Sequence, residues 1–378
     1  MKYEPIVKPD FKILDGLRGI AACYVVINHS RGNLLIGGSA YAALKPISNW
    51  DWTEKLYYSA LQLTALGREF VIIFFVLSGF SIAHSLNYST SLTKFYQRRA
   101  IRLYPPYLTA LFWAYIVFVF IASVTPELVT GKSSVFADSA YAISNLFYIP
   151  QGALIGQFWS LTHEVIFYLL ISIAILKLKW YYIVSVALYL IGWIINPVSV
   201  STSILTAFIF DYNIYFALGI FLYFNYNKFE KYFLTNWLKL AIISIGFIIS
   251  MAVIKFITND ENKITLFIAG FFSLYLIFNF QDKKITNKGL AFLGMMSYTL
   301  YITHLATIFL YKSLLLHFGL IPSIPITNKW IWILGVFFSI FISFIIYLIS
   351  ERPTKRVLDY LRTRDKQKSA TAKRLTQP

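Results

Sequence analysis

Three polar side chains lie on one stripe of the first hydrophobic segment, which reads FKILDGLRGIAACYVVINHS. Arg18 follows Asp15 by three residues and His29 follows Arg18 by eleven, which on an α-helix is almost a whole number of turns. Arg18 and His29 therefore face the same way, about 16 Å apart along the helix axis. A membrane helix tolerates such groups where they face a protein interior or a water-filled cavity, because lipid exposure is costly. The stripe is the strongest functional indication in the chain.

His29 is the candidate general base. The sequence holds five histidines, and His29 is the one that shares a helix face with two charged side chains. A neutral imidazole can take a proton from a hydroxyl group near pH 7, which few other side chains can do. A buried structural histidine is the alternative for any single polar residue in an apolar helix. The two charged neighbours favour function over packing.

A basic turn opens the third apolar segment, in FYQRRAIRLYPPYL. Its members are Lys94, Arg98, Arg99 and Arg102. Arg99 and Arg102 are three residues apart, so they point the same way, and a guanidinium fork matches phosphate oxygens. An anionic donor such as a nucleotide-bearing thioester would suit this turn; a plain positive-inside anchor is the alternative. The pair Pro105-Pro106 predicts that the helix breaks or begins there.

Other ionisable or aromatic residues in apolar surroundings are secondary candidates. Glu164, near Trp159 in FWSLTHEVIFY, either faces a cavity or pairs with an arginine. Glu351, in SERPTKR, is either functional or forms an interfacial charge pair beside Arg352. His304, in MSYTLYITHLA, either lines the cavity or is structural, and the sequence leaves both open.

The composition indicates a membrane protein. Hydrophobic residues make up 58% of the chain and charged residues 13%, against about a quarter charged in soluble domains. We therefore predict an all-α polytopic membrane protein, with about ten transmembrane helices forming one bundle around a central polar cavity. The predicted spans are 13–30, 68–87, 105–124, 158–176, 180–196, 204–224, 238–257, 264–280, 290–315 and 330–350.

One membrane domain is expected over residues 11–353. It follows a short N-terminal segment, 1–10, and precedes a basic tail, 354–378, that is poor in apolar residues. Such a composition is typical of disorder, so we expect the tail to be disordered. Segment 139–150 is apolar but short, which predicts a re-entrant or interfacial element.

The net charge of +17 follows from membrane topology. Ten spans put both termini on one side, and that side receives 24 of the 34 lysines and arginines. This asymmetry predicts cytoplasmic termini and attraction to anionic membrane lipid, and it makes nucleic-acid binding improbable. Cys23 is the one cysteine, which rules out an intrachain disulfide and a thiolate metal cage. No metal is expected.

Six sequence blocks in a fixed order resemble the acyltransferase-3 family of integral-membrane acyltransferases. They are LDGLRGIAACYVVINH, FFVLSGFSI, RRAIRLYPPY, FWSLTHEVIFY, SYTLYITH and SERP, and they run from Phe11 to Pro353. The resemblance marks Arg18 and His29 as essential for transfer. It also assigns Arg99 and Arg102 to the acyl-CoA donor, and Glu164 and Glu351 to the acidic positions of two blocks.

The resemblance implies a membrane acyltransferase that moves an acyl group, most commonly acetyl, from cytoplasmic acyl-CoA to a hydroxyl of a surface or secreted glycan or another acceptor. It places the protein in the inner membrane of a bacterium. Larger members append an extra helix and an extracytoplasmic esterase-like domain that completes transfer. This chain has neither, so we expect stand-alone transfer or a separate extracytoplasmic partner.

The residues and the resemblance agree on one mechanism. Arg99 and Arg102 hold the donor phosphates, and His29 acts as general base or as a transient acyl carrier. Asp15 or Glu164 orients the ring of His29, and Arg18 fixes the donor or stabilises developing negative charge. Two rivals remain: a proton-coupled carrier or flippase of a polysaccharide-assembly pathway, with the stripe as its proton relay, and a non-enzymatic assembly subunit.

Overall fold

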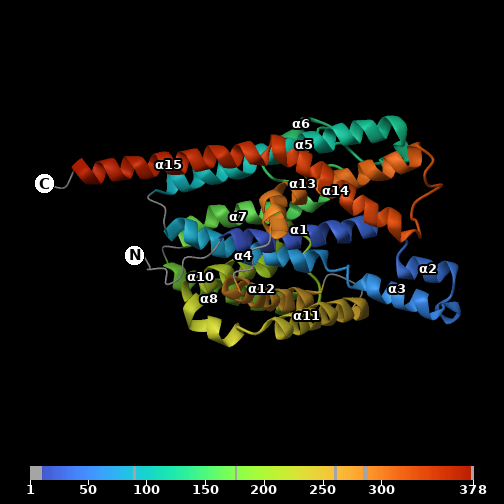
Figure 1. The fold of residues 1–378 in the computed structure, drawn as a ribbon, viewed down its shortest axis with the longest axis horizontal. Helices are drawn as coiled ribbons and strands as arrows, with labels where there is room; N and C mark the ends of the chain where they lie inside the picture. The colour runs from blue at the N-terminus through green and yellow to red at the C-terminus, as the bar shows by residue number, and fades with distance from the viewer. Residues whose placement is uncertain (1–10, 88–90, 175–176, 259–261, 284–287, 376–378) are drawn as a thin grey trace.

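The structure is a computed structural model that describes residues 11–87, 91–174, 177–258, 262–283 and 288–375. Over these residues the chain is helical, with two isolated β-bridges and no strand. The predicted N-terminal segment, 1–10, lies outside the described residues. The long helices pack in one bundle (Figure 1): α1 (Phe11–Leu34), α4 (Gly67–Asn87), α5 (Leu92–Val124), α7 (Trp159–Ala174), α8 (Leu178–Ile195), α10 (Asn213–Phe233), α11 (Trp237–Thr258), α12 (Lys263–Lys283), α13 (Lys288–His317) and α14 (Lys329–Ile349).

Eight helical segments among the described residues are long and apolar enough to cross a membrane. They hold eight of the ten predicted spans, and α1 and α7 hold the other two. The prediction of an all-α polytopic membrane protein is therefore confirmed. Shorter helices lie between the predicted spans: α2 (Gly38–Leu44), α3 (Trp52–Gln62) and α6 (Ser139–Leu146); α9 (Ile204–Ala207) is the first turn of the predicted span 204–224. Of these, α6 lies in the segment predicted to be interfacial or re-entrant.

The proline pair Pro105-Pro106 lies inside α5, which continues through it without a break. The prediction that the helix breaks or begins there is wrong. Proline lacks an amide N–H, so carbonyls one turn earlier lose their helical partners. Membrane helices tolerate this loss because neighbouring groups supply other hydrogen bonds. The carbonyls that lose their helical donors are those of Ile101 and Arg102, four residues before each proline; the hydroxyl of Tyr298 on α13 donates to the neighbouring carbonyl of Leu103 at 3.2 Å. The unbroken helix carries its basic turn into the bundle.

The tail predicted to be disordered forms a helix, α15 (Glu351–Leu375). It lies beside the first half of α5 and extends beyond the end of the bundle that is opposite α2 and α3 (Figure 1). Leu358 is buried, and the carboxylate of Asp365 binds Arg98 at 2.6 Å and Lys94 at 3.4 Å, both on α5. The prediction was wrong because it used composition, which does not reveal a tertiary ion pair or a single packed leucine.

Glycines at close crossings fix the helices that carry the site. α1 meets α13 where Gly19 faces Gly294, and a Cβ on Gly19 would lie 2.7 Å from the Gly294 nitrogen. α4 meets α10 at Gly219, whose Cβ position is taken by the carbonyl oxygen of Val76. Small residues allow helix backbones to approach this closely in membranes. Any larger residue at these points would push the helices apart.

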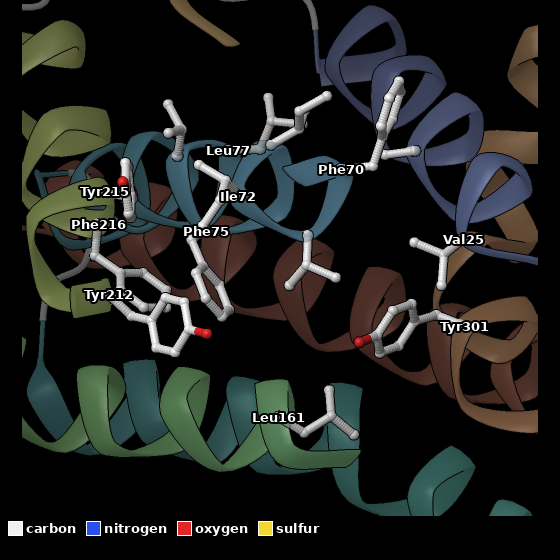
Figure 2. Packing of buried hydrophobic residues seen from close by; sticks show 14 of the residues in the cluster. Val25, Phe70, Ile72, Phe75, Leu77, Leu161, Tyr212, Tyr215, Phe216 and Tyr301 are labelled. Carbon is white, nitrogen blue, oxygen red and sulfur yellow. The ribbon is translucent and has the colours of Figure 1, made fainter. Parts of the chain in front are cut away.

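Aromatic rings fill the space between α4 and α10. Phe75 packs against Phe216 with ring centroids 4.6 Å apart, and Tyr212 contacts the ring of Phe75 edge-on. Figure 2 shows these rings on one side, Tyr301 of α13 on the other, and Leu161 of α7 between them and below. Phe75, Leu161 and Tyr301 also line a cavity inside the bundle.

Candidate active site

Five helices enclose a polar cavity of about 60 Å³, room for on the order of four water molecules. Its polar lining combines three guanidinium groups, one carboxylate and six hydroxyl groups, from Arg18, Arg99, Arg102, Glu164, Ser78, Ser160, Tyr168, Ser297, Tyr298 and Tyr301. These residues come from α1, α4, α5, α7 and α13. The central polar cavity predicted from the sequence is present, and cations outnumber anions in its lining.

Arg18 joins α1 to α4 at one wall of this cavity. Its Nη1 donates to Asp15 Oδ1 at 2.8 Å, and its Nη2 donates to Ser81 Oγ at 2.7 Å and to the carbonyl of Leu77 at 3.1 Å. Asp15 lies one helical turn before Arg18, as the sequence spacing requires. The guanidinium is therefore held in one orientation by three groups, which leaves it fixed beside the cavity.

Glu164 supplies the carboxylate of the cavity. Its Oε1 accepts hydrogen bonds from Ser78 Oγ at 2.8 Å and from the hydroxyl of Tyr168, one turn along α7. The guanidinium carbon of Arg99 stacks over the ring of Tyr168, 5.4 Å from the ring centroid. Ser78, Glu164, Tyr168 and Arg99 thus form a connected row from α4 through α7 to α5.

The basic turn of α5 divides into two pairs. Arg99 and Arg102 line the cavity, as their spacing predicted, and Arg99 also donates to Ser85 Oγ at 3.0 Å. Lys94 and Arg98 point to α15, where both bind Asp365. One pair therefore faces a buried space that attracts anions, while the other anchors a neighbouring helix.

His29 lies further along α1, against His304 of α13, with ring centroids 5.2 Å apart. His304 is fully buried, and its Nδ1 lies 3.2 Å from the carbonyl oxygen of Leu300. Neither histidine lines the cavity among the described residues. The ring that lies against His29 thus belongs to a histidine, in the place where the sequence led us to expect a carboxylate from Asp15 or Glu164.

Tyr301 separates the cavity from the histidine pair. Its ring lines the cavity and lies 5.8 Å from the ring of His304, one turn further along α13. Its hydroxyl is 2.7 Å from Ser160 Oγ and donates to the carbonyl of Gln157 at 3.1 Å. The site therefore has two parts, a cationic cavity and a histidine pair, with one tyrosine at the boundary.

Like Asp15 and the two histidines, two further predicted residues lie outside the cavity lining. Trp159 belongs to the aromatic cluster, 5.3 Å from the ring of Tyr212, and the guanidinium of Arg68 lies over it at 5.4 Å. Glu351 begins α15 and is buried. It accepts from the backbone N–H and hydroxyl of Thr299 at 3.1 and 2.7 Å, and it pairs with Lys355 at 2.9 Å. The charge pair expected beside Arg352 is instead made with Lys355, one turn further along the helix.

The sequence reasoning missed three hydroxyl-bearing residues that organise the cavity: Ser78, Ser81 and Tyr168. Serines inside apolar helices carry little signal, because they also bond to their own backbone. Tyr168 had a readable signal, since it follows Glu164 by four residues and such pairs meet on a helix face. The links between helices depend on tertiary packing.

The described helices form a bundle of membrane-spanning length with a cationic cavity beside a pair of histidines. The chain matches the family described as "Acyltransferase domain" over residues 11–348, so it belongs to the acyltransferase-3 family. A curated relative, "Acyltransferase MdmB" of Streptomyces mycarofaciens, is 33% identical over 115 residues. That match covers 29% of this chain and 28% of the relative. No solved structure matches.

Proposed function

We propose that this acyltransferase moves an acetyl group from acetyl-CoA, bound from the cytoplasm, to a hydroxyl group of a surface or secreted glycan. The observation that carries the proposal is the convergence of Arg18, Arg99 and Arg102 on one buried cavity next to His29 and His304. Three guanidinium groups beside one carboxylate favour an anion there. Coenzyme A carries several phosphate charges, so an acyl-CoA fits this requirement.

The donor end of the site is the side of the cavity formed by α5. Arg99 and Arg102 project from successive turns toward the same space, which suits the oxygens of a phosphate or pyrophosphate group. The ring of Tyr168 supports Arg99 from below, and Glu164 holds the hydroxyl of that tyrosine. The donor arginine is thus preorganised, which reduces the entropy lost on binding.

The transfer step takes place near His29. One ring nitrogen of His29 accepts the proton of the acceptor hydroxyl while the hydroxyl oxygen attacks the thioester carbonyl. A new C–O bond forms, the C–S bond breaks, and the CoA thiolate leaves and takes up the proton. Arg18 lies at the cavity wall, about 16 Å from His29 along the axis of α1, so its fixed guanidinium holds the donor within the cavity and not the reacting carbonyl.

The basic end of the bundle supports the proposed orientation. Lys94 and Arg98 bind Asp365 of α15, which also carries exposed arginines. α15 extends from the end of the bundle that is opposite α2 and α3 (Figure 1). Positive charge concentrates on the cytoplasmic side of membrane proteins. We therefore place this end in the cytoplasm and the protein in the inner membrane of a bacterium, with α2 and α3 on the acceptor side.

The donor site is tested by binding of CoA to the purified protein in lipid nanodiscs, measured by calorimetry. Arg99→Ala or Arg102→Ala should each weaken binding by about 10- to 100-fold, the loss expected for a charge-assisted hydrogen bond. Arg98→Ala is the matched control. Arg98 belongs to the same basic turn but binds Asp365 of α15, so its removal should leave the CoA affinity at the wild-type value. Equal effects of all three variants would contradict the donor site.

A further inference from the structure

We propose that His304 is a positioning residue for His29: its Nε2 accepts a hydrogen bond from a ring N–H of His29 and so determines which nitrogen of His29 is free to act. The inference rests on the proposed function, in which His29 takes the acceptor proton. It assigns a role to a residue whose sequence context left two readings open, structural or cavity-lining.

The backbone of α13 fixes the tautomer of His304. Its Nδ1 lies 3.2 Å from the carbonyl oxygen of Leu300. A carbonyl oxygen accepts hydrogen bonds and cannot donate them, so Nδ1 must carry the proton. In a neutral imidazole the other nitrogen, Nε2, is then an acceptor. His304 therefore presents an acceptor to whatever lies beyond its ring edge.

That acceptor is buried and needs a donor. His304 has no exposed surface, and Nε2 makes no hydrogen bond with any residue in the described part of the chain. A buried polar atom without a partner incurs its desolvation cost without compensation. The ring of His29 lies 5.2 Å away between centroids and is tilted by 48°, so a rotation of the His29 side chain would bring one of its ring N–H groups toward Nε2. His29 is thus a donor within reach.

The hydrogen bond would decide the chemistry of His29. When one N–H of His29 donates to His304, the opposite nitrogen carries no proton and can accept one from the substrate hydroxyl. The imidazolium that forms keeps its first N–H bonded to His304, so its orientation does not change during transfer. A carboxylate holds the catalytic histidine in this way in serine hydrolases; here a second imidazole occupies that place.

His163 provides a matched control inside the same protein. It is also buried, its Nδ1 also contacts a carbonyl one turn earlier, that of Trp159, and its Nε2 is also without a hydrogen bond among the described residues. Its ring neighbours are aromatic side chains of the packed cluster, such as Tyr212 at 4.9 Å. The two histidines therefore share burial and backbone contact but differ in the presence of His29.

The first test is nitrogen NMR of the full chain in lipid nanodiscs, with 15N-labelled histidine. Five histidines give few enough signals to assign by single replacement. We expect His304 to be protonated on Nδ1 and His29 to show one protonated and one bare nitrogen. In His304→Leu, the two His29 nitrogens should average toward a common tautomer mixture, whereas His163→Leu should leave them unchanged. His29 signals that are the same in His304→Leu and wild type would overturn the proposal.

The second test is steady-state transfer with labelled acetyl-CoA in membrane vesicles that carry the protein. His304→Leu should lower kcat by about 100-fold while the KM for acetyl-CoA stays within about twofold, because the donor phosphates bind elsewhere. His304→Gln keeps an acceptor oxygen and should recover most of the loss. His163→Leu should keep kcat even where it lowers thermal stability. A wild-type kcat in His304→Leu, or no recovery in a folded His304→Gln, would refute the role. An inactive wild-type protein would refute the acetyl-CoA reaction itself, and the NMR result would still decide the histidine pair.

Discussion

Tyr168 gives a test of how the cavity holds its donor arginine, because its two contacts can be removed one at a time. Its hydroxyl donates to Glu164, and its ring supports the guanidinium of Arg99 at 5.4 Å. Tyr168→Phe deletes the hydroxyl and keeps the aromatic face. Tyr168→Leu deletes both. The difference between the two variants therefore isolates the cation–π contact.

The magnitudes follow from these contacts. A hydrogen bond to a charged group contributes about 1.5–3 kcal/mol, although Glu164 keeps its bond from Ser78 in either variant. Tyr168→Phe should therefore lower stability by about 2 kcal/mol and leave CoA affinity within about twofold. A partly desolvated cation–π contact adds about 1 kcal/mol. Tyr168→Leu should therefore also weaken CoA binding, by about fivefold, because Arg99 loses its support.

The assay is paired calorimetry and thermal unfolding on the purified protein in nanodiscs. The account predicts that thermal stability falls in both variants and that CoA affinity falls in Tyr168→Leu. If Tyr168→Phe weakens CoA binding as much as Tyr168→Leu does, the hydroxyl of Tyr168 and not its ring orients Arg99, contrary to the cation–π role. Unchanged affinity in both variants would show that Arg99 needs no support from this tyrosine.

Two further predictions concern the fold. Gly219→Val should prevent α4 and α10 from packing, because the new valine side chain would collide with the Val76 carbonyl. The monodisperse peak in size-exclusion chromatography should then disappear. Gly246→Val is the control, since the space around Gly246 is open, and it should elute like the wild type. Asp365 holds α15 against α5, and its hydrogen bond to Arg98 lowers the pKa of its carboxyl group below the usual range. A lowered pKa stabilises docking of α15 at pH values above the ordinary aspartate pKa of about 4. The distance between spin labels on α15 and α5 should therefore stay short at neutral pH and lengthen as the pH falls through the lowered pKa. Asp365→Asn should lengthen this distance at pH 7, and a short distance in that variant would contradict the role of the ion pair.

The membrane helices were predictable because hydropathy is a local property of the sequence. The ten predicted spans coincide with helices of the bundle, since a segment that crosses lipid must satisfy its own backbone hydrogen bonds. Local rules failed where distant residues intervene. Pro105-Pro106 predicts a helix break or start, but α5 continues through both prolines inside the packed bundle. The tail was read as disordered, but Asp365 joins it to α5.

The cavity was partly predictable for a similar reason. Helical spacing placed Arg99 and Arg102 on one face, and the structure puts both in the cavity lining. Spacing along α1 could not show which group meets His29, because that depends on how α13 crosses α1 at the glycines. His304 therefore became interpretable once the two helices were placed together. The catalytic roles of these residues remain predictions.

Acyl transfer from acetyl-CoA that depends on His29 can be measured directly in membrane vesicles. Inside-out membrane vesicles with wild-type protein or with His29→Ala are given acetyl-CoA labelled with carbon-14, and labelled ester is quantified together with free CoA thiol. We expect equal release of thiol and gain of ester with the wild type, and neither with a correctly inserted His29→Ala protein. Ester formation by that variant, or substrate flux without thiol release by the wild type, would contradict this expectation.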